Sequence, residues 1–270
     1  MSYYTSLTGL RNAQTELNTI SNNLANAETT GFKKSTVNFA DIIGGSSYTN
    51  SKTEVGLGSL VKTIDQDFSS GAVKNTGSAL DLAVNGNGFF SVVTPSGTQT
   101  LYTRNGNFTT DGSGNLKDSD GNSVQVLAYD SASGTFATTP SNGVIPPTNS
   151  AGSAFTGVQV KTDGSIVASY ADGTINTVSK VALANFVSPT GLKQVGNQEW
   201  QVTGLSGAAV YTAPSDGGSG TILSGSLEQS NVDTAQEMVG LITAQRYFQA
   251  NAKAIDANTQ ISDAVIQLRS

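Results

Sequence analysis

The chain begins and ends with the hydrophobic pattern of amphipathic helices. Near the N-terminus, apolar residues recur at alternating spacings of three and four, the seam pattern of a coiled coil, at Leu10, Ala13, Leu17, Ile20, Leu24 and Ala27. The last segment, residues 233–268, has a wider apolar stripe, no proline, and no glycine after Gly240. The pattern predicts helices over residues 3–27 and 233–268, with Asp233 as the N-cap of the second.

The middle of the chain has a different pattern, in which short apolar stretches alternate with turn residues. The strongest strand signal covers residues 80–93, where apolar residues flank a Gly-Asn-Gly turn. Asp-Gly pairs at 163–164 and 172–173 separate further short strands. This rhythm is typical of an antiparallel sheet and not of alternating strand and helix units.

The sequence therefore predicts an α+β protein with terminal helices and a mainly antiparallel β middle domain. Residues 1–30 and 233–270 form a coiled-coil-like helical domain. Residues 31–72 form an extended connector with a flexible glycine break at 44–47. Residues 73–232 form a β-rich domain. On periodicity alone, two arrangements of the helices stay open: a hairpin that completes a monomer, or a surface that packs on other copies.

The composition of the chain excludes most kinds of catalytic site. The 270 residues include no cysteine and no histidine, which excludes thiolate nucleophiles, Ser-His-Asp and Cys-His constellations and the commonest metal ligands. The net charge of −6 argues against a nucleic-acid partner. The first eight residues contain no Lys or Arg, so we expect no cleaved signal peptide.

Four local features could carry chemistry, and each has a simpler interpretation. The turn at residues 86–88 lacks the third glycine of a nucleotide loop. Residues 118–122 resemble part of a calcium loop, but the glycine and the final acidic ligand are misplaced, so a turn is favoured. The carboxylate pair Asp65 and Asp67 is more typical of a solvated turn. Trp200 could stack on a sugar, although a partly buried core residue is commoner. We therefore predict no catalytic residue, metal or cofactor.

Five ordered motifs resemble the bacterial flagellar rod and hook axial proteins. They lie at residues 21–33 (SNNLANAETTGFK), 80–90 (LDLAVNGNGFF), 102–108 (YTRNGNF), 225–233 (GSLEQSNVD) and 244–255 (AQRYFQANAKAI). Residues 130–200 carry little of the resemblance.

The resemblance implies a structural subunit, not an enzyme, that leaves the cell through the flagellar type III export apparatus and polymerises into a helical tube. It implies other axial proteins as partners: rod, hook cap and hook–filament junction proteins. Self-assembly would be carried by Leu10, Leu17, Ile20, Leu24, Met238, Leu241, Phe248 and Ile255. The turn from the first helix to the connector would be formed by Asn23, Asn26, Gly31 and Phe32.

Within the family, the short segment between Asp41 and Gly56 favours a hook protein, the flexible joint that transmits motor torque. The length of 270 residues is nearer that of rod proteins. A distal or proximal rod protein is therefore the alternative. A secreted carbohydrate-binding β domain and a carboxylate-based hydrolase are more remote alternatives.

Overall fold

A computed structural model of the chain describes residues 2–43, 56–130 and 134–267. The predicted glycine break at residues 44–47 and Leu268 lie outside the described residues. The chain folds into two compact units. The helical unit contains Met1–Ala27, Lys34–Asp67 and Val232–Ser270, and the β unit contains Glu28–Lys33 and Phe68–Asn231.

The two predicted terminal helices are present. Helix α1 spans Ser2–Ala25 and helix α2 spans Thr234–Gln267. Asp233 is the N-cap of α2, as predicted, because its Oδ1 accepts hydrogen bonds from the backbone N–H groups of Ala235 at 2.9 Å and Gln236 at 3.2 Å. Among the described residues, neither helix combines the length and the apolarity that a membrane span requires.

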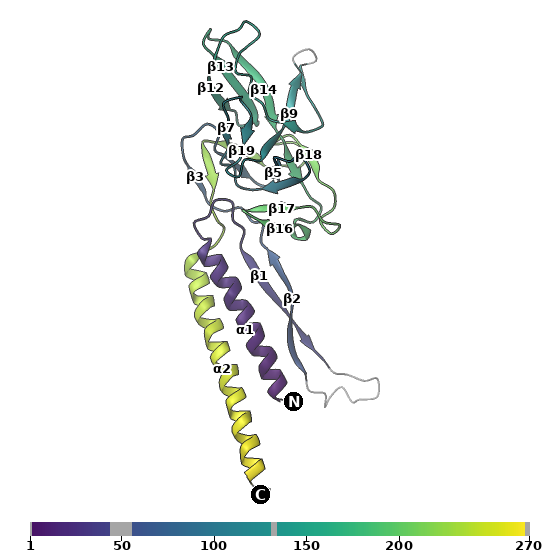
Figure 1. The fold of residues 1–270 in the computed structure, drawn as a ribbon, viewed down its shortest axis with the longest axis vertical. Coiled ribbons are helices and arrows are strands. Elements are labelled where there is room, and N and C mark those ends of the chain that lie inside the picture. The colour runs from purple at the N-terminus through teal and green to yellow at the C-terminus, as the bar shows by residue number, and fades with distance from the viewer. Residues whose placement is uncertain (1, 44–55, 131–133, 268–270) are drawn as a thin grey trace. The chain divides into compact units, whose positions relative to one another are not determined.

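Helices α1 and α2 pack side by side and antiparallel within the helical unit (Figure 1). Small residues permit the close approach. A Cβ added to Gly9 would lie 2.6 Å from Oδ1 of Asn251, and one added to Gly240 would lie 3.3 Å from Cδ1 of Ile20. Ala244 is fully buried in the same seam. The helical pairing follows from these contacts, whereas a coiled-coil supercoil stays a prediction.

The predicted connector contains regular structure. Strands β1 (Ser35–Ile42) and β2 (Gly58–Gln66) form an antiparallel two-stranded sheet with a bulge between Asn38 and Phe39. This hairpin belongs to the helical unit. The structure thus differs from an extended connector because the two segments satisfy their backbone hydrogen bonds on each other.

The described residues of the β unit form eighteen short strands, β3 to β20. The first nine are β3 (Val73–Asn75), β4 (Leu82–Asn85), β5 (Phe89–Val93), β6 (Thr100–Thr103), β7 (Thr109–Thr110), β8 (Leu116–Lys117), β9 (Ser123–Asp130), β10 (Thr135–Phe136) and β11 (Ser141–Asn142). The others are β12 (Phe155–Val160), β13 (Ser165–Tyr170), β14 (Ile175–Val181), β15 (Leu183–Asn185), β16 (Lys193–Gly196), β17 (Glu199–Gln201), β18 (Val210–Thr212), β19 (Thr221–Ser224) and β20 (Ser226–Glu228). A single 3-10 turn, η1, covers Pro189–Gly191.

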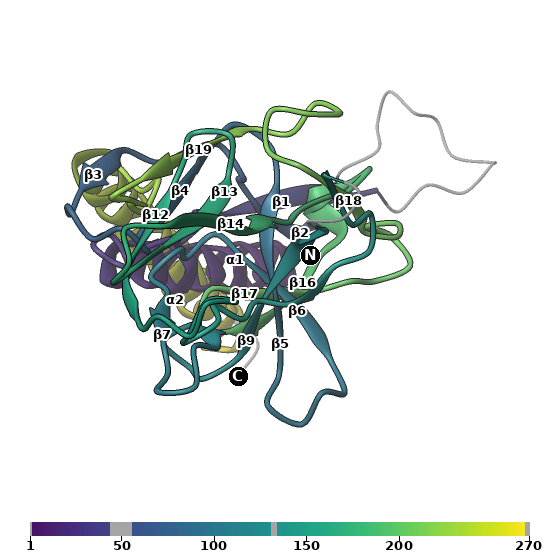
Figure 2. The ribbon, with the colours of Figure 1, turned by 90° about the horizontal axis from the view of Figure 1, so that it is seen from above.

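The strands pair antiparallel, which confirms the predicted sheet type. The main sheet has the order β12-β13-β14-β9-β5-β6-β17-β16, and the pairs β19-β4 and β20-β3 form two small sheets. Figure 2 shows the same strands from above. Strand β3 pairs with β20 and β4 pairs with β19, so the first two strands of this unit pair with its last two.

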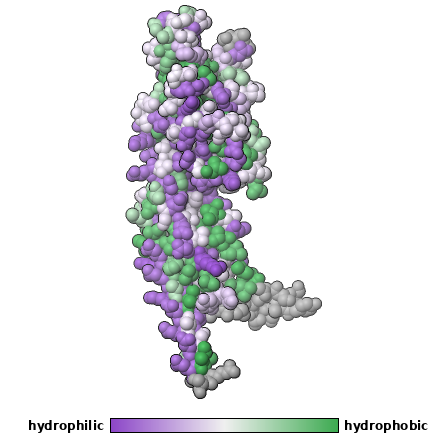
Figure 3. Space-filling model, viewed as in Figure 1, coloured by the Kyte–Doolittle hydropathy of each residue, from purple (hydrophilic) through white to green (hydrophobic). Residues whose placement is uncertain are grey.

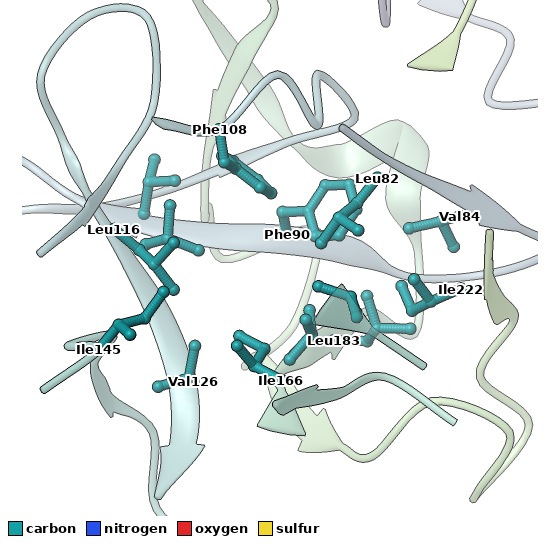
Figure 4. Packing of buried hydrophobic residues seen from close by; sticks show 14 of the residues in the cluster. Leu82, Val84, Phe90, Phe108, Leu116, Val126, Ile145, Ile166, Leu183 and Ile222 are labelled. Atoms are coloured by element: carbon teal, nitrogen blue, oxygen red, sulfur yellow. The ribbon is translucent and has the colours of Figure 1, made fainter. Parts of the chain in front are cut away.

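A single large apolar cluster fills the β unit (Figure 4). Phe90 on β5 packs edge-on against Phe108, with ring centroids 5.1 Å apart. Leu183 and Ile222, from late strands, are completely buried in the same cluster. Burying side chains of this size stabilises a fold by about 1.5–3 kcal/mol each.

A smaller aromatic cluster surrounds Trp200, the only tryptophan of the chain. Its ring centroid lies 5.5 Å from that of Phe68 and 5.8 Å from that of Phe89. Because Trp200 is only 1% exposed, it offers no stacking surface to a sugar. The remote carbohydrate-binding alternative therefore loses the residue on which it depended.

Candidate functional site: buried ionic clusters and a helical seam

A buried ionic cluster joins three of the sequence motifs inside the β unit. The Nζ of Lys33 lies 2.7 Å from Oε1 of Glu228, and Nη1 of Arg104 lies 3.2 Å from Oε2 of the same carboxylate. All three side chains are at most 3% exposed. Removing one partner of an ion pair this deeply buried is strongly destabilising, because it leaves an uncompensated charge in the interior.

Backbone groups complete the coordination of this cluster. Glu228 accepts a hydrogen bond at 2.9 Å from the N–H of Gly71, and Lys33 donates one at 2.6 Å to the carbonyl of Ser69. The carbonyl of Glu228 accepts from the N–H of Gly31 at 2.8 Å. The Lys33–Glu228–Arg104 cluster therefore joins four separate segments of the chain, at residues 31–33, 69–71, 104 and 228.

Gly31 and Phe32, two of the predicted site residues, lie beside this cluster and are buried. Gly31 has a positive φ of 72°, and a Cβ at this position would lie 2.6 Å from the backbone N of Asn105. A side chain would thus meet both an unfavourable backbone conformation and a rigid neighbour. This geometry explains why the motif has glycine here.

Gly31→Ala is expected to destabilise the β unit by about 1–3 kcal/mol more than Gly77→Ala does. Gly77 has nearly the same φ, 75°, but no atom lies within 4 Å of its added Cβ. The control therefore carries the conformational cost without the steric one. Urea unfolding followed by Trp200 fluorescence measures both. Equal losses for the two variants would contradict the role of the close contact with Asn105.

A second ionic cluster lies in the helical unit and uses the next residue of the chain. The Nζ of Lys34 lies 2.7 Å from Oε1 of Glu237 in the first turn of α2. Asn23, fully buried on α1, donates to Oε2 of Glu237 at 3.1 Å. Asn23 also exchanges two hydrogen bonds with the backbone of Ser35, at 2.8 and 2.9 Å. The cluster thereby joins α1, α2 and the start of β1.

Asn26, the other predicted turn asparagine, bonds locally. Its backbone N–H and its side-chain amide both donate to the carbonyl of Asn22, at 3.2 and 2.9 Å. These bonds satisfy a carbonyl at the end of α1 that has no further helical partner. The predicted role of Asn26 in the turn after α1 stays a prediction, and its contacts fit that role.

The apolar positions predicted for self-assembly fall into two groups. Most are half-buried in the helical unit: Leu10, Leu17, Ile20, Leu24, Leu241, Phe248 and Ile255. Met238 is different, because it is 55% exposed. The positions of Leu241, Phe248 and Ile255 share one face of α2 with the buried Ala244. The structure thus leaves most of the predicted set half-buried within the helical unit and Met238 on the surface, and their role in self-assembly stays a prediction.

The charged members of the two clusters were missed by the sequence interpretation. Lys33 and Lys34 form the only basic pair of the chain, and Glu228 lies inside a motif. A signal was present, since only 13% of residues are charged and Lys33, Arg104 and Glu228 fall within motifs rich in small and amide residues. Charge type alone does not identify the partner, because Lys33 and Glu228 are 195 positions apart.

The chain is similar to known proteins along almost its whole length. Three family models match: flagella basal body rod protein over residues 4–33, flagellar hook protein FlgE/F/G D1 domain over residues 83–168, and flagellar basal body rod FlgEFG protein C-terminal over residues 223–268. The chain is 36% identical to flagellar basal-body rod protein FlgG of Bacillus subtilis, with 99% of this chain and 98% of that protein covered. The chain belongs to the flagellar rod and hook axial protein family.

Two further relatives indicate the breadth of this family. FlgG of Caulobacter vibrioides is 34% identical, with 98% of each chain covered. Flagellar hook protein FlgE of Escherichia coli is 26% identical over an alignment of 410 positions that covers both chains completely. The family is structural, so this chain is a flagellar axial structural protein and not an enzyme.

One acidic cluster of this axial protein has an unusual titration. Carboxylate oxygens of Asp118, Asp120 and Glu199 lie within 4.8 Å of one another. Asp118 accepts hydrogen bonds from the N–H groups of Asp120 and Asn122, and the Asn122 amide donates to Glu199 at 2.6 Å. Residues 118–122 therefore form a hydrogen-bonded turn, as predicted. Burial, and to a smaller extent the charges of Asp118 and Asp120, together raise the pKa of Glu199 to about 7.

This shift predicts that the stability of the β unit falls as pH rises from about 4.5 to about 7. Across that window the folded state binds more protons than the unfolded state, in which Glu199 has its ordinary pKa near 4.5. Glu199→Gln removes this slope and is expected to raise stability at pH 8 by about 1 kcal/mol, allowing for solvent screening. Urea unfolding at pH 5 and pH 8 measures both effects. The exposed Glu28→Gln is the matched control and should change neither. A Glu199→Gln variant less stable than the parent at pH 8 would contradict the assignment.

Proposed function

We propose that this chain is a subunit of the flagellar rod, the rigid shaft of the basal body, and not of the hook. The observation that carries the proposal is its end-to-end alignment with rod proteins. The alignment with FlgG of Bacillus subtilis covers 280 positions, close to the 270 residues of this chain. The alignment with FlgE of Escherichia coli needs 410 positions, so 140 of them have no residue from this chain.

This proposal replaces the hook as the favoured member of the family. The short segment between Asp41 and Gly56 favoured the hook in the sequence interpretation, while the total length favoured the rod. The relatives support the rod interpretation, which was based on the total length of the chain. The chain divides into one helical unit and one β unit, which fits a short axial subunit.

The surface of the helical unit supports assembly into a polymer. Large apolar side chains remain exposed along α2: Met238, Val239, Ile242, Tyr247, Ile261, Val265 and Ile266. Figure 3 shows hydrophobic residues, in green, at the surface of this unit. Exposed apolar side chains in such number mark interaction surfaces. Contacts between different faces of identical subunits generate open helical filaments.

In this proposal, the α1–α2 pair packs against the same pair in neighbouring copies to form the wall of a tube. The predicted set on the seam would position the helices, and Met238 would contact a second copy directly. Other flagellar axial proteins adjoin the ends of the tube. The chain reaches its place through the flagellar export apparatus.

Electron microscopy of the purified protein under polymerising conditions tests the proposal. A straight, rigid tube is the expected result. A tube that supercoils would assign the chain to the hook. Failure to form any polymer, with both units folded by circular dichroism, would contradict self-assembly through the helices.

A further inference from the structure

A pocket of about 230 Å³ lies in the helical unit, where α1, the start of β1 and the first turn of α2 meet. Two of its lining residues, Lys34 and Glu237, are already paired with each other at 2.7 Å. Glu16, a third charged lining residue, is half-buried. Within the part of the chain that the structure describes, its carboxylate makes no hydrogen bond and no ion pair. The pocket therefore has one carboxylate that is available to a partner.

The surroundings of Glu16 favour an arginine side chain as that partner. Ile20 and Val37 contribute apolar side chains to the same lining. A half-buried carboxylate without a partner is costly, because its hydration is incomplete. A guanidinium can donate two parallel hydrogen bonds to one carboxylate, and the apolar stem of an arginine can pack along aliphatic side chains. An incoming arginine would thus match both the charge and the apolar wall.

Arg246 is an exposed arginine on the face of α2 that points away from α1. Ala244 is fully buried in the seam with α1, and a residue two positions later lies roughly 200° around the helix axis. Arg246 makes no hydrogen bond or ion pair with the described residues of its own chain. Val239 and Ile242, which are 65% and 49% exposed, precede it at spacings of three and four. This outer face of α2 therefore presents an unpaired guanidinium beside two apolar side chains.

The other cation of α2, Lys253, is a weaker candidate. It lies on the same outer face, seven positions after Arg246. Asp256 follows Lys253 by three positions, so a carboxylate lies next to this lysine on the helix surface. None of the residues three or four positions from Arg246 is acidic. Arg246 is therefore the cation of α2 that lacks a carboxylate on its own helix.

We propose that Arg246 of one copy enters the pocket of a neighbouring copy and pairs with its Glu16. This inference rests on the proposed assembly of copies through their helical units. The two groups belong to different faces of the unit, because Arg246 points away from α1 and Glu16 belongs to α1. The contact is therefore heterologous, and each added copy leaves one pocket and one arginine free for the next. Such a contact produces an open helical filament.

Charge reversal tests the pair. Glu16→Arg and Arg246→Glu are each expected to raise the critical concentration for polymerisation roughly 10- to 100-fold, since each places like charges in the contact. The double variant Glu16→Arg with Arg246→Glu should polymerise within about threefold of the parent, because it restores the pair in the opposite sense. Sedimentation measures the critical concentration. Circular dichroism checks the helices, and the exposed position of Arg246 separates a lost contact from a lost fold.

The matched control is the double variant Glu16→Arg with Lys253→Glu. It has the same net charge as the restoring double variant, but its new carboxylate lies seven positions away from the proposed contact. It should polymerise no better than Glu16→Arg alone. Parental critical concentrations for both single variants, no rescue by the double variant, or equal rescue by the control would overturn the pair and leave the rod proposal in place. Absence of polymer from the parent chain would overturn both.

Discussion

Glu228→Gln is expected to destabilise the β unit by about 3–5 kcal/mol. The substitution keeps the shape of the side chain but removes the negative charge that Lys33 and Arg104 share. Lys33 and Arg104, each at most 3% exposed, would then lose the carboxylate that they share in the interior. Such a loss is a large fraction of the total stability of a domain.

Urea unfolding followed by Trp200 fluorescence measures this loss. The matched control is Glu199→Gln, the same chemical change at another buried glutamate of the β unit. The two variants should move in opposite directions at pH 8, because Glu228 faces two cations and Glu199 faces two aspartates. A loss below 1 kcal/mol for Glu228→Gln would mean that water or another anion already compensates the cluster.

The position of Glu228 gives this cluster a consequence for folding. The β unit begins with residues 28–33 and ends with residues 68–231, so Lys33 and Glu228 come from its two extremes. Strand β20 also pairs with β3, and β19 with β4. The unit is therefore incomplete until the segment directly before α2 is available.

The helices were predictable because their signals are local. A spacing of three and four fixes the face of α1, and Asp233 caps α2 through hydrogen bonds two and three residues away. The antiparallel sheet was predictable for the same reason, since each turn lies between the strands that it joins. Elements that are determined by residues close together in the sequence could thus be predicted without the structure.

The pairing of β1 with β2 and the ionic clusters were not predictable in this way. The burial pattern of β1 breaks its alternation at the bulge next to Phe39, so no clear period of two was present. Lys33 and Arg104 find Glu228 across 195 and 124 positions. Only the fold brings these side chains together, because loop closure over such distances has no local signature.

Leu17→Asp is expected to abolish polymerisation while the β unit stays folded. Leu17 lies half-buried on the seam of α1 in the helical unit. Burial of a leucine is worth about 1.5–3 kcal/mol, and a carboxylate at the same place adds the cost of desolvating a charge. A tube repeats this loss at every subunit, so a moderate change per contact prevents the whole polymer from growing.

Asn18→Asp is the matched control, because it introduces the same charge at the next residue of α1, where the side chain is exposed. Sedimentation and electron microscopy measure the polymer, and Trp200 fluorescence checks the β unit in both variants. The expected result is tubes from Asn18→Asp, none from Leu17→Asp, and native Trp200 emission from both. Normal tubes from Leu17→Asp would show that the seam of α1 does not take part in assembly. Loss of Trp200 burial in that variant would instead mean that the β unit depends on the helical unit for its own stability, although its core clusters contain no residue of α1 or α2.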